Sequence, residues 1–348
     1  MDEDVPGSPA PAPPDSPGAA TPWLLAGDVG GTSSRLVLAA PDGTVRAEVT
    51  GPGANLRSSG TDALDHVRDA ARTLLARGEA LCSARAPVAA AVLGVSGAGP
   101  ARAAEVRAAV TERLGALGID PARVRVTDDL LTAFLSGGVG DDGLLLLAGT
   151  GAVGVRFEGR EAVARRDGMG WLLGDVGSAV WLGRRTLEAV AADLDGRGPR
   201  TGLTEALGAV LELDLRDGAR PPSTTGDPRQ DLIRALDDLL PAGAPAALGR
   251  FAPLPGTLPE DEVAGAILAA VVAHVRDGVR ALDPRATLPV VLAGSVHTAP
   301  GPLRTGIEAA LREEGRLVRS AVTGLPGALL LASELAARRA AEPDGRDH

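Results

Sequence analysis

The sequence repeats one order of short elements, and this repeat constrains the fold more than any other feature. Residues 24–49 read LLAGDVGGTSSRLVLAAPDGTVRAEV, and residues 145–165 read LLLAGTGAVGVRFEGREAVAR. Each copy predicts a buried strand, a loop of glycine and hydroxyl residues, a second strand, a tight turn and a third strand. Because an internal repeat decides the architecture, the sequence predicts an α/β fold with two similar lobes that face a shared cleft.

The glycine-rich loop of the first copy has the groups that bind a phosphate. Gly30 and Gly31 let backbone N–H groups come close to an anion, and Thr32 adds a hydroxyl donor. Asp28 offers a carboxylate oxygen of the kind that holds Mg²⁺. The spacing matches neither a P-loop nor a dinucleotide-binding motif. A metal–polyphosphate ligand suits this loop, although a plain turn between two strands would use the same glycines.

The composition narrows the class of protein. The chain has 348 residues, enough for two domains, and its formal net charge of −10 argues against non-specific binding of nucleic acid. Its one cysteine, Cys82, excludes an internal disulfide and a cysteine-based metal site within one chain. Neither a signal-peptide pattern nor an uncharged run long enough to span a bilayer is present. We therefore expect a cytoplasmic protein that binds small molecules and not a membrane.

The rest of the chain divides into a tail, two lobes and an insertion. Residues 1–22 are rich in proline, alanine, aspartate and serine and predict a disordered tail. We expect the N-terminal lobe at 23–128, joined by a C-terminal helix at about 326–340, and the C-terminal lobe at 129–325. Within the second lobe, residues 203–259 are punctuated by proline and aspartate and predict a helical insertion.

Hydrophobic periodicity predicts the individual elements. Strands are expected at 23–26, 35–40, 44–50, 88–95, 124–126, 144–148, 153–157, 161–165, 288–293 and 317–322. Helices are expected at 61–77, 101–117, from 130 onward, 178–194, 203–213, 231–240, 260–282, 303–313 and 324–340. The run VAAAVLGV at 88–95 is typical of a strand buried on both faces.

Four motifs occur in an order that resembles the actin-like sugar kinase superfamily, which includes hexokinase, actin and glycerol kinase. They are GDVGGTSSR at 27–35, GTG at 149–151, GDVGS at 174–178, and an apolar strand that ends in GS at 294–295. Within the superfamily, the chain resembles N-acetylglucosamine kinases of the BadF/BadG/BcrA/BcrD ATPase family from about residue 23 to residue 340. The resemblance implies two ribonuclease-H-like lobes that close around ATP and a sugar.

The resemblance also implies which residues bind the nucleotide and its metal. Asp28 would serve Mg²⁺, the first glycine loop and the GTG loop would contact the phosphates, and the GS pair would border the adenosine. The residues implied to contact ATP are Gly30, Gly31, Thr32, Thr150, Gly151, Gly294 and Ser295.

Phosphoryl transfer to a sugar hydroxyl needs a carboxylate that accepts the proton of the hydroxyl. The resemblance matches Asp129 to this catalytic aspartate, which also contacts the sugar. Asp129 follows the strand expected at 124–126, and open α/β sheets place ligands at the carboxyl ends of their strands. Asp128 is the alternative base, and capping of the helix that follows is the structural alternative for both aspartates.

Two further residues match sugar-contacting positions of the family. Asn55 is the only asparagine in the chain and follows the third strand of the first copy. Asp175 lies in a glycine-rich turn, from which a carboxylate can reach two hydroxyl groups of a sugar. A role confined to a turn is the alternative for each residue.

The chain departs from the family at three positions near the implied sugar and phosphate pockets. Ala152 stands where the family usually has serine, Val176 where it usually has glutamate, and Val153 where some relatives have asparagine. These changes remove polar groups, so the identity of the sugar stays open. The expected reaction is phosphorylation of N-acetylglucosamine at its 6-hydroxyl in amino-sugar salvage. Glucosamine, N-acetylmuramic acid or another hexose is the alternative substrate.

Other functions are weighed against this one. The three departures keep a non-catalytic sugar or nucleotide sensor open. Family members that activate dehydratases share an iron–sulfur cluster between paired cysteines, which Cys82 alone does not provide. A sugar-responsive transcriptional regulator needs a helix-turn-helix segment, which the short proline-rich tail does not form. The helical insertion is a candidate surface for a homodimer.

The histidines and tryptophans carry no clear functional signal. His66, His274, His297 and His348 lack the spacing of metal ligands and are expected on the surface or on helices. Trp171 and Trp181 are expected in the core, and a platform on which a sugar stacks is the alternative for both.

Overall fold

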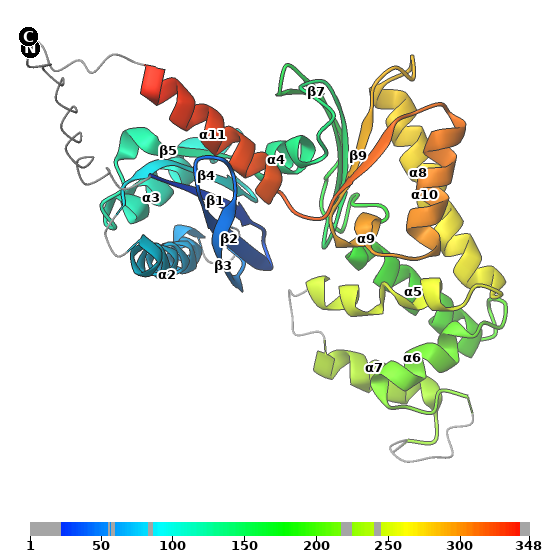
Figure 1. Cartoon of the computed structure of the whole chain (residues 1–348). Helices are drawn as coiled ribbons and strands as arrows, with labels where there is room; N and C mark the ends of the chain where they lie inside the picture. Colours follow the sequence, from blue (N-terminus) through cyan, green and yellow to red (C-terminus); the bar gives the residue numbers. More distant parts are fainter. Residues whose placement is uncertain are drawn as a thin grey trace, which may run out of the picture.

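The computed structural model describes residues 22–54, 56, 60–82, 86–216, 225–239 and 245–341. Asn55, His348 and the predicted tail up to residue 21 lie outside these described residues. The described chain forms two lobes, each built on a five-stranded mixed sheet (Figure 1). This is the two-lobed α/β fold that the repeat predicts, whereas the lobe boundaries at 128/129 and 325/326 stay a prediction.

The sheet of the N-terminal lobe has the strand order β3-β2-β1-β4-β5. Its first three strands pair antiparallel, while β1, β4 and β5 run parallel. Their bounds are β1 Trp23–Val29, β2 Ser33–Ala39, β3 Val45–Pro52, β4 Val88–Val95 and β5 Val124–Asp128.

The sheet of the C-terminal lobe has the strand order β10-β9-β6-β7-β8. Its bounds are β6 Gly143–Ala148, β7 Ala152–Glu158, β8 Glu161–Asp167, β9 Val290–Ala293 and β10 Val318–Ala321. When the strands of the two lobes are matched in chain order, both sheets have the same order and the same pattern of parallel and antiparallel pairs. The lobes are therefore copies of one unit.

Helices cover both sheets and fill the space between them. Those of the first lobe are η1 Gly60–Leu64, α2 Asp65–Cys82, α3 Ala103–Gly115 and η2 Pro121–Arg123. Then come α4 Asp129–Ser136, α5 Ala179–Leu194, α6 Leu203–Leu211, α7 Pro228–Leu239, η3 Pro245–Phe251 and η4 Leu254–Thr257. The last are α8 Glu262–Leu282, α9 Ser295–Thr298, α10 Pro302–Glu313 and α11 Leu325–Ala341. None of the described helices is both long and apolar enough to cross a membrane.

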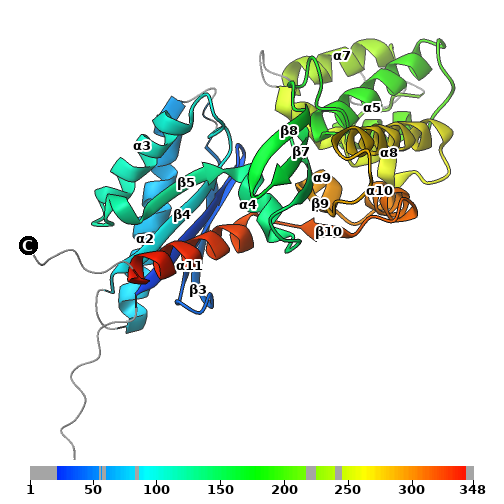
Figure 2. The ribbon, with the colours of Figure 1, turned by 90° about the horizontal axis from the view of Figure 1, so that it is seen from above.

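Helix α4 lies between the two sheets (Figure 2). Its sequence, DLLTAFLS, is apolar on every side, and all six residues from Leu130 to Leu135 are buried. A helix that is apolar all round has to be enclosed by other elements. Phe134 of α4 stacks on Phe157 of β7 with ring centroids 4.6 Å apart. Alternate residues of the first sheet face α4 and α11 on one side and α2 and α3 on the other.

The second lobe places α8 and α10 on the face of its sheet opposite α4. Helices α5, α6 and α7 form a smaller core of their own, around Leu203, Leu207 and Phe251. This core includes most of the insertion expected at 203–259. Trp181 is buried, as expected, but Trp171 is 44% exposed, so its assignment to the core is wrong. Trp171 lies in the loop after β8.

Candidate active site

The loop after β1 contains one tight turn. The Gly30 N–H donates to the Ser33 carbonyl oxygen at 2.9 Å, while Gly31 and Thr32 are exposed. A Cβ atom added at Gly31 would meet nothing within 4 Å. The backbone here faces open space, as a loop that wraps an anion has to do.

The segment after β3 packs directly on this loop. A Cβ atom at Gly53 would overlap the backbone nitrogen of Thr32 and lie 2.5 Å from that of Ser33. The Ala54 N–H donates to the Gly30 carbonyl oxygen at 2.9 Å. The two residues before Asn55 are therefore part of the wall of the first glycine loop, and only glycine fits at position 53.

The loop after β6 is tied to the start of α5. The Gly149 N–H donates to the Gly151 carbonyl oxygen at 2.9 Å, and the Gly149 carbonyl oxygen accepts from the Ala179 N–H at 2.8 Å. Thr150 is exposed. A Cβ atom at Gly151 would lie 2.9 Å from Oδ2 of Asp175, so the implied second phosphate loop and the implied sugar residue are neighbours.

The GS pair after β9 lies against the same loop. Gly294 has a φ of 80°, and a Cβ atom there would overlap the carbonyl oxygen of Ala148. Ser295, exposed, begins α9, a four-residue helix that the sequence pattern did not predict. His297 lies on this helix, and its Nδ1 is 3.1 Å from the Leu146 carbonyl oxygen. Burial lowers the pKa of His297 to about 4.

Asp129 follows β5 at the carboxyl edge of the first sheet. Burial raises its pKa well above the ordinary value of 3.8, and a hydrogen bond with Asp128 and the charges of Asp128 and Asp28 raise it further. A hydrogen bond from Ser96 acts in the opposite direction. Three acidic side chains are thus gathered at one edge, and their proximity favours the protonated form of Asp129.

Asp128 is engaged as a helix cap and as a partner of the other lobe. Its Oδ1 accepts from the Leu130 N–H at 3.1 Å, which caps α4, and Oδ2 is 3.2 Å from Nη2 of Arg165. Arg165 belongs to β8, so this ion pair joins the two lobes. Capping of α4 therefore falls to Asp128, and Asp129 is left for other chemistry.

Asp28 uses one of its two oxygens to bind the other end of the chain. Oδ2 accepts from the Thr323 hydroxyl at 2.8 Å and from the Gly324 N–H at 2.7 Å, just before α11. Among the described residues, no hydrogen bond reaches Oδ1. Mg²⁺ binds through one or two carboxylates while keeping several waters. The donor set fits such an ion, and no cluster of three or more ligating side chains occurs in the described parts of the chain.

Asp175 is nearly buried in a left-handed conformation with a φ of 55°. Its Oδ1 accepts from the Gly170 N–H at 3.2 Å, so part of the carboxylate stabilises the loop after β8. The turn role that was the alternative for this residue is thus present. It does not conflict with sugar binding, because a carboxylate has four lone-pair positions.

The family follows from the sequence match. The BadF/BadG/BcrA/BcrD ATPase family matches residues 28–332. The chain belongs to this family. This ATPase family accounts for the duplicated lobes and for the two glycine loops, and the membership confirms the resemblance predicted from the four motifs.

Individual proteins similar to this chain are named for one kind of enzyme. An N-acetyl-D-glucosamine kinase of Dictyostelium discoideum is 36% identical over 126 residues, which are 34% of this chain and 38% of that kinase. The match thus spans little more than a third of that relative. A structure from Chromobacterium violaceum, provisionally named an N-acetylglucosamine kinase, has a TM-score of 0.69 and 26% identity over 90% of this chain and 99% of its own.

A third relative shows the fold alone. A structure from Porphyromonas gingivalis, also provisionally named an N-acetylglucosamine kinase, has a TM-score of 0.68 at 21% identity and covers 90% of this chain and 99% of its own. Both structures cover 90% of this chain, which confirms the two-lobed fold.

Sequence reasoning missed several residues of the site. Ser96, Arg165 and Asp167 were not singled out, although Asp167 ends β8 and Arg165 lies two residues before that end. Ser96 directly follows the apolar strand β4, a signal that would have placed it at the ligand edge. Thr323 comes two residues after β10, but its contact with Asp28 spans most of the chain and leaves no local pattern.

Proposed function

We propose that this protein is an ATP-dependent sugar kinase that phosphorylates N-acetylglucosamine at its 6-hydroxyl. The observation that carries the proposal is the half-buried Asp129 carboxyl at the carboxyl edge of the first sheet, with its raised pKa, close to Asp28 of β1. A base with a raised pKa accepts a hydroxyl proton more readily as the phosphoryl group is transferred. Family membership and the named relatives support ATP as donor and an amino sugar as acceptor.

The phosphates of ATP would lie between the two glycine loops. On one side Gly31 borders open space and Thr32 is exposed, and on the other side the exposed Thr150 hydroxyl is a donor. Gly294 brings Ser295 next to the second loop, where it would border the nucleotide. When bound at Oδ1 of Asp28, Mg²⁺ would neutralise charge on the outer phosphates.

Asp129 would act on the acceptor hydroxyl from the edge of the first sheet. Its oxygens accept the hydroxyl proton, and Ser96 holds the carboxyl in place by a hydrogen bond. Asp175 would bind two further hydroxyl groups of the sugar from the opposite lobe. Asn55, which lies outside the described residues, is proposed to contact the sugar from the loop that begins at Gly53.

The sugar could also be glucosamine, N-acetylmuramic acid or another hexose. Val153 and Val176 line one small cavity beneath the Asp175 turn, so neither adds a polar group to that side of the site. The proposed setting is amino-sugar salvage in the cytoplasm, where ATP is available.

A substrate panel tests the proposal. Purified protein is given ATP, Mg²⁺ and one sugar at a time, and ADP release is followed in a coupled assay. We expect turnover with N-acetylglucosamine that stops when EDTA removes the metal. Turnover with a different sugar replaces N-acetylglucosamine by that substrate. If no sugar in the panel releases ADP above the sugar-free rate, the kinase proposal is wrong and a sensor takes its place.

A further inference from the structure

Asp167 ends strand β8 in an unusual conformation. Its φ is 63°, it pairs with Val153 of β7, and its side chain is only 9% exposed. A left-handed backbone costs energy for a residue with a side chain. Such a cost is tolerated where the surrounding contacts impose the conformation, and at Asp167 those contacts are numerous.

The Asp167 carboxylate is the acceptor around which the next loop is built. Its Oδ1 accepts from the Asp175 N–H at 2.6 Å and from the Gly168 N–H at 2.8 Å. Its Oδ2 accepts from the Val176 N–H at 2.9 Å. These bonds fix the backbone on both sides of the Asp175 Cα atom. Charge-assisted bonds of this kind are about twice as strong as neutral ones.

The space in the loop is shaped to the same carboxylate. A Cβ atom at Gly174 would overlap Oδ1 of Asp167, so any other residue there would push the carboxylate away. Asp175 itself has a left-handed φ and contacts the position of Gly151 in the second glycine loop. The direction of the Asp175 side chain therefore depends on where Asp167 lies.

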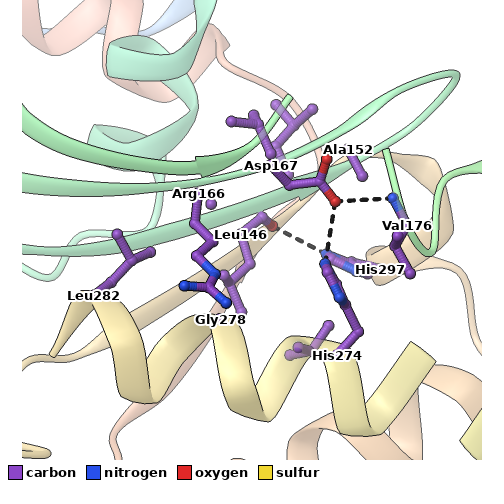
Figure 3. Close-up of a pocket in the computed structure, with 13 residues that line it drawn as sticks. Leu146, Ala152, Arg166, Asp167, Val176, His274, Gly278, Leu282 and His297 are labelled. Atoms are coloured by element: carbon purple, nitrogen blue, oxygen red, sulfur yellow. Dashed lines mark hydrogen bonds and ion pairs between the residues drawn. The ribbon is translucent and has the colours of Figure 1, made fainter. Parts of the chain in front are cut away.

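Helix α8 supports Asp167 from behind. Nε2 of His274 is 3.1 Å from Oδ2 of Asp167 (Figure 3). One turn earlier on α8, Cγ1 of Val271 lies 2.6 Å from where a Cβ atom of Gly177 would be. The cavity between α8 and the sheet measures about 30 Å³, which holds about one water and is too small for a sugar or nucleotide. The contact between His274 and Asp167 therefore supports the Asp175 turn from below and does not bind a ligand of that size.

We propose that Asp167 is a positioning residue that holds the Asp175 turn in its sugar-binding geometry, and that His274 holds Asp167. The inference rests on the proposed sugar-kinase function. In this proposal the Asp167 carboxylate orients the Asp175 carboxylate toward the sugar, and Asp167 itself does not contact a substrate.

Kinetics of three variants test the proposal. Asp167→Asn keeps the shape but turns an NH₂ group toward backbone N–H groups, so the turn loses acceptors. We expect the KM for sugar to rise about tenfold, because one such bond is worth roughly a factor of ten. The KM for ATP should stay within about twofold. His274→Leu should raise the sugar KM by a smaller factor, and His274→Gln, which keeps a donor, should restore it.

Asp142→Asn is the matched control. Asp142 also accepts a backbone N–H, that of Gly159 at 2.6 Å, but at the opposite end of the same sheet. The KM of the Asp142→Asn variant for sugar should equal that of the wild type. The proposal is overturned if Asp167→Asn leaves the sugar KM unchanged, or if it raises the KM values for ATP and sugar equally.

Hydrogen exchange of the sugar-free protein gives a second readout. At least one of the amides of Asp175 and Val176 should exchange about tenfold faster in Asp167→Asn, because asparagine keeps only one of the two acceptor oxygens, and neither should exchange faster in Asp142→Asn. If the wild-type protein phosphorylates no sugar, the proposed function fails by itself. Unchanged exchange at both amides would then still refute the support of the turn by Asp167.

Discussion

The two copies of the repeated unit share a topology but differ in the charge they present. In the aligned sequences, Asp28 of the first copy corresponds to Thr150 of the second. Asp28 lies near the carboxyl end of β1, and Thr150 follows the matching β6. Asp128 ends β5 and Asp129 follows it, whereas the uncharged Thr323 and Gly324 come shortly after the matching β10. At this edge the first copy therefore presents carboxylates, which we propose serve a metal ion and a proton, and the second presents the exposed Thr150 hydroxyl, which we propose serves phosphate.

The copies also differ in how the segment after the third strand reaches the glycine loop. In the first copy, Gly53 packs backbone against backbone on Thr32. In the second, the Asp175 side chain packs on Gly151 and is itself held by Asp167. One arrangement needs a glycine, whereas the other needs a network of hydrogen bonds. Duplication preserved the contact but not its chemistry.

Removal of the charge at Asp129 in the first copy should have the largest effect of any substitution on catalysis. We expect Asp129→Asn to lower kcat by about 10³-fold, since general-base catalysis is worth about 10²–10⁴, with sugar affinity within a few-fold. Asp128→Asn should keep most of the activity, because an asparagine still caps α4. Steady-state kinetics and sugar titration check both variants. Retained turnover in Asp129→Asn together with lost turnover in Asp128→Asn would transfer the role of base to Asp128.

The Asp129→Asn variant should also become more stable than the wild type at high pH. The pKa of Asp129 is raised in the folded protein, so the folded state binds more protons than the unfolded state above the ordinary value of 3.8. Stability of the wild type then falls as pH rises from there through the raised pKa. An asparagine side chain does not titrate and carries no such penalty, so the Tm difference between the variant and the wild type should grow from pH 5 to pH 8.

Four glycine-to-alanine substitutions should separate packing from ligand binding in the two copies. Gly53→Ala should cost about 3 kcal/mol, the upper range for overpacking, because its Cβ would overlap backbone. Gly151→Ala should cost about 1 kcal/mol, because the Asp175 carboxylate can shift. Gly31→Ala and Gly149→Ala face open space and should keep stability within about 0.5 kcal/mol.

Gly31→Ala and Gly149→Ala should instead raise the KM for ATP, because the added methyl groups occupy the space proposed for the phosphates. Urea unfolding and ATP kinetics measure the two quantities separately. Equal losses of stability in all four variants would show that the open positions are as tightly packed as the others, and the proposed phosphate site would then be wrong.

The sequence was a good guide to the elements whose signals are local. The apolar run at 88–95 matches β4 residue for residue, and both glycine loops lie where the repeat placed them. Strands β1 and β2 extend further toward their loop than predicted, because pairing continues through Asp28 and Val29. Helix α9 is a single short turn, too brief to produce a periodic pattern.

The long-range contacts that organise the site could not be predicted from local sequence patterns. Asp28 meets Thr323 across 295 positions, and Asp167 meets His274 across 107. Each is a single polar residue in a sequence rich in aspartate and arginine, so nothing local marks it. Only the folding of α8 and α11 against the sheets brings these partners together.

The smallest effect expected concerns the ion pair between the copies. Arg165 of the second copy lies 3.2 Å from Asp128 of the first, and its side chain is 45% exposed. In Arg165→Gln the negative charge of Asp128 is no longer offset, so the pKa of Asp129 should rise further. The acid limb of kcat/KM against pH should then move to higher pH by about 0.5 unit, since exposed pairs contribute less than about 1 kcal/mol.

Salt provides the check on this shift. Screening by 1 M NaCl should abolish most of it, because the guanidinium group is open to solvent. Arg185→Gln removes an arginine that is exposed to the same degree and pairs with Glu188 on α5, and it should leave the pH profile unmoved. A limb that moves to lower pH in Arg165→Gln, or that stays in place, would mean that the second copy contributes no charge to the base and that the acidic edge of the first copy acts alone.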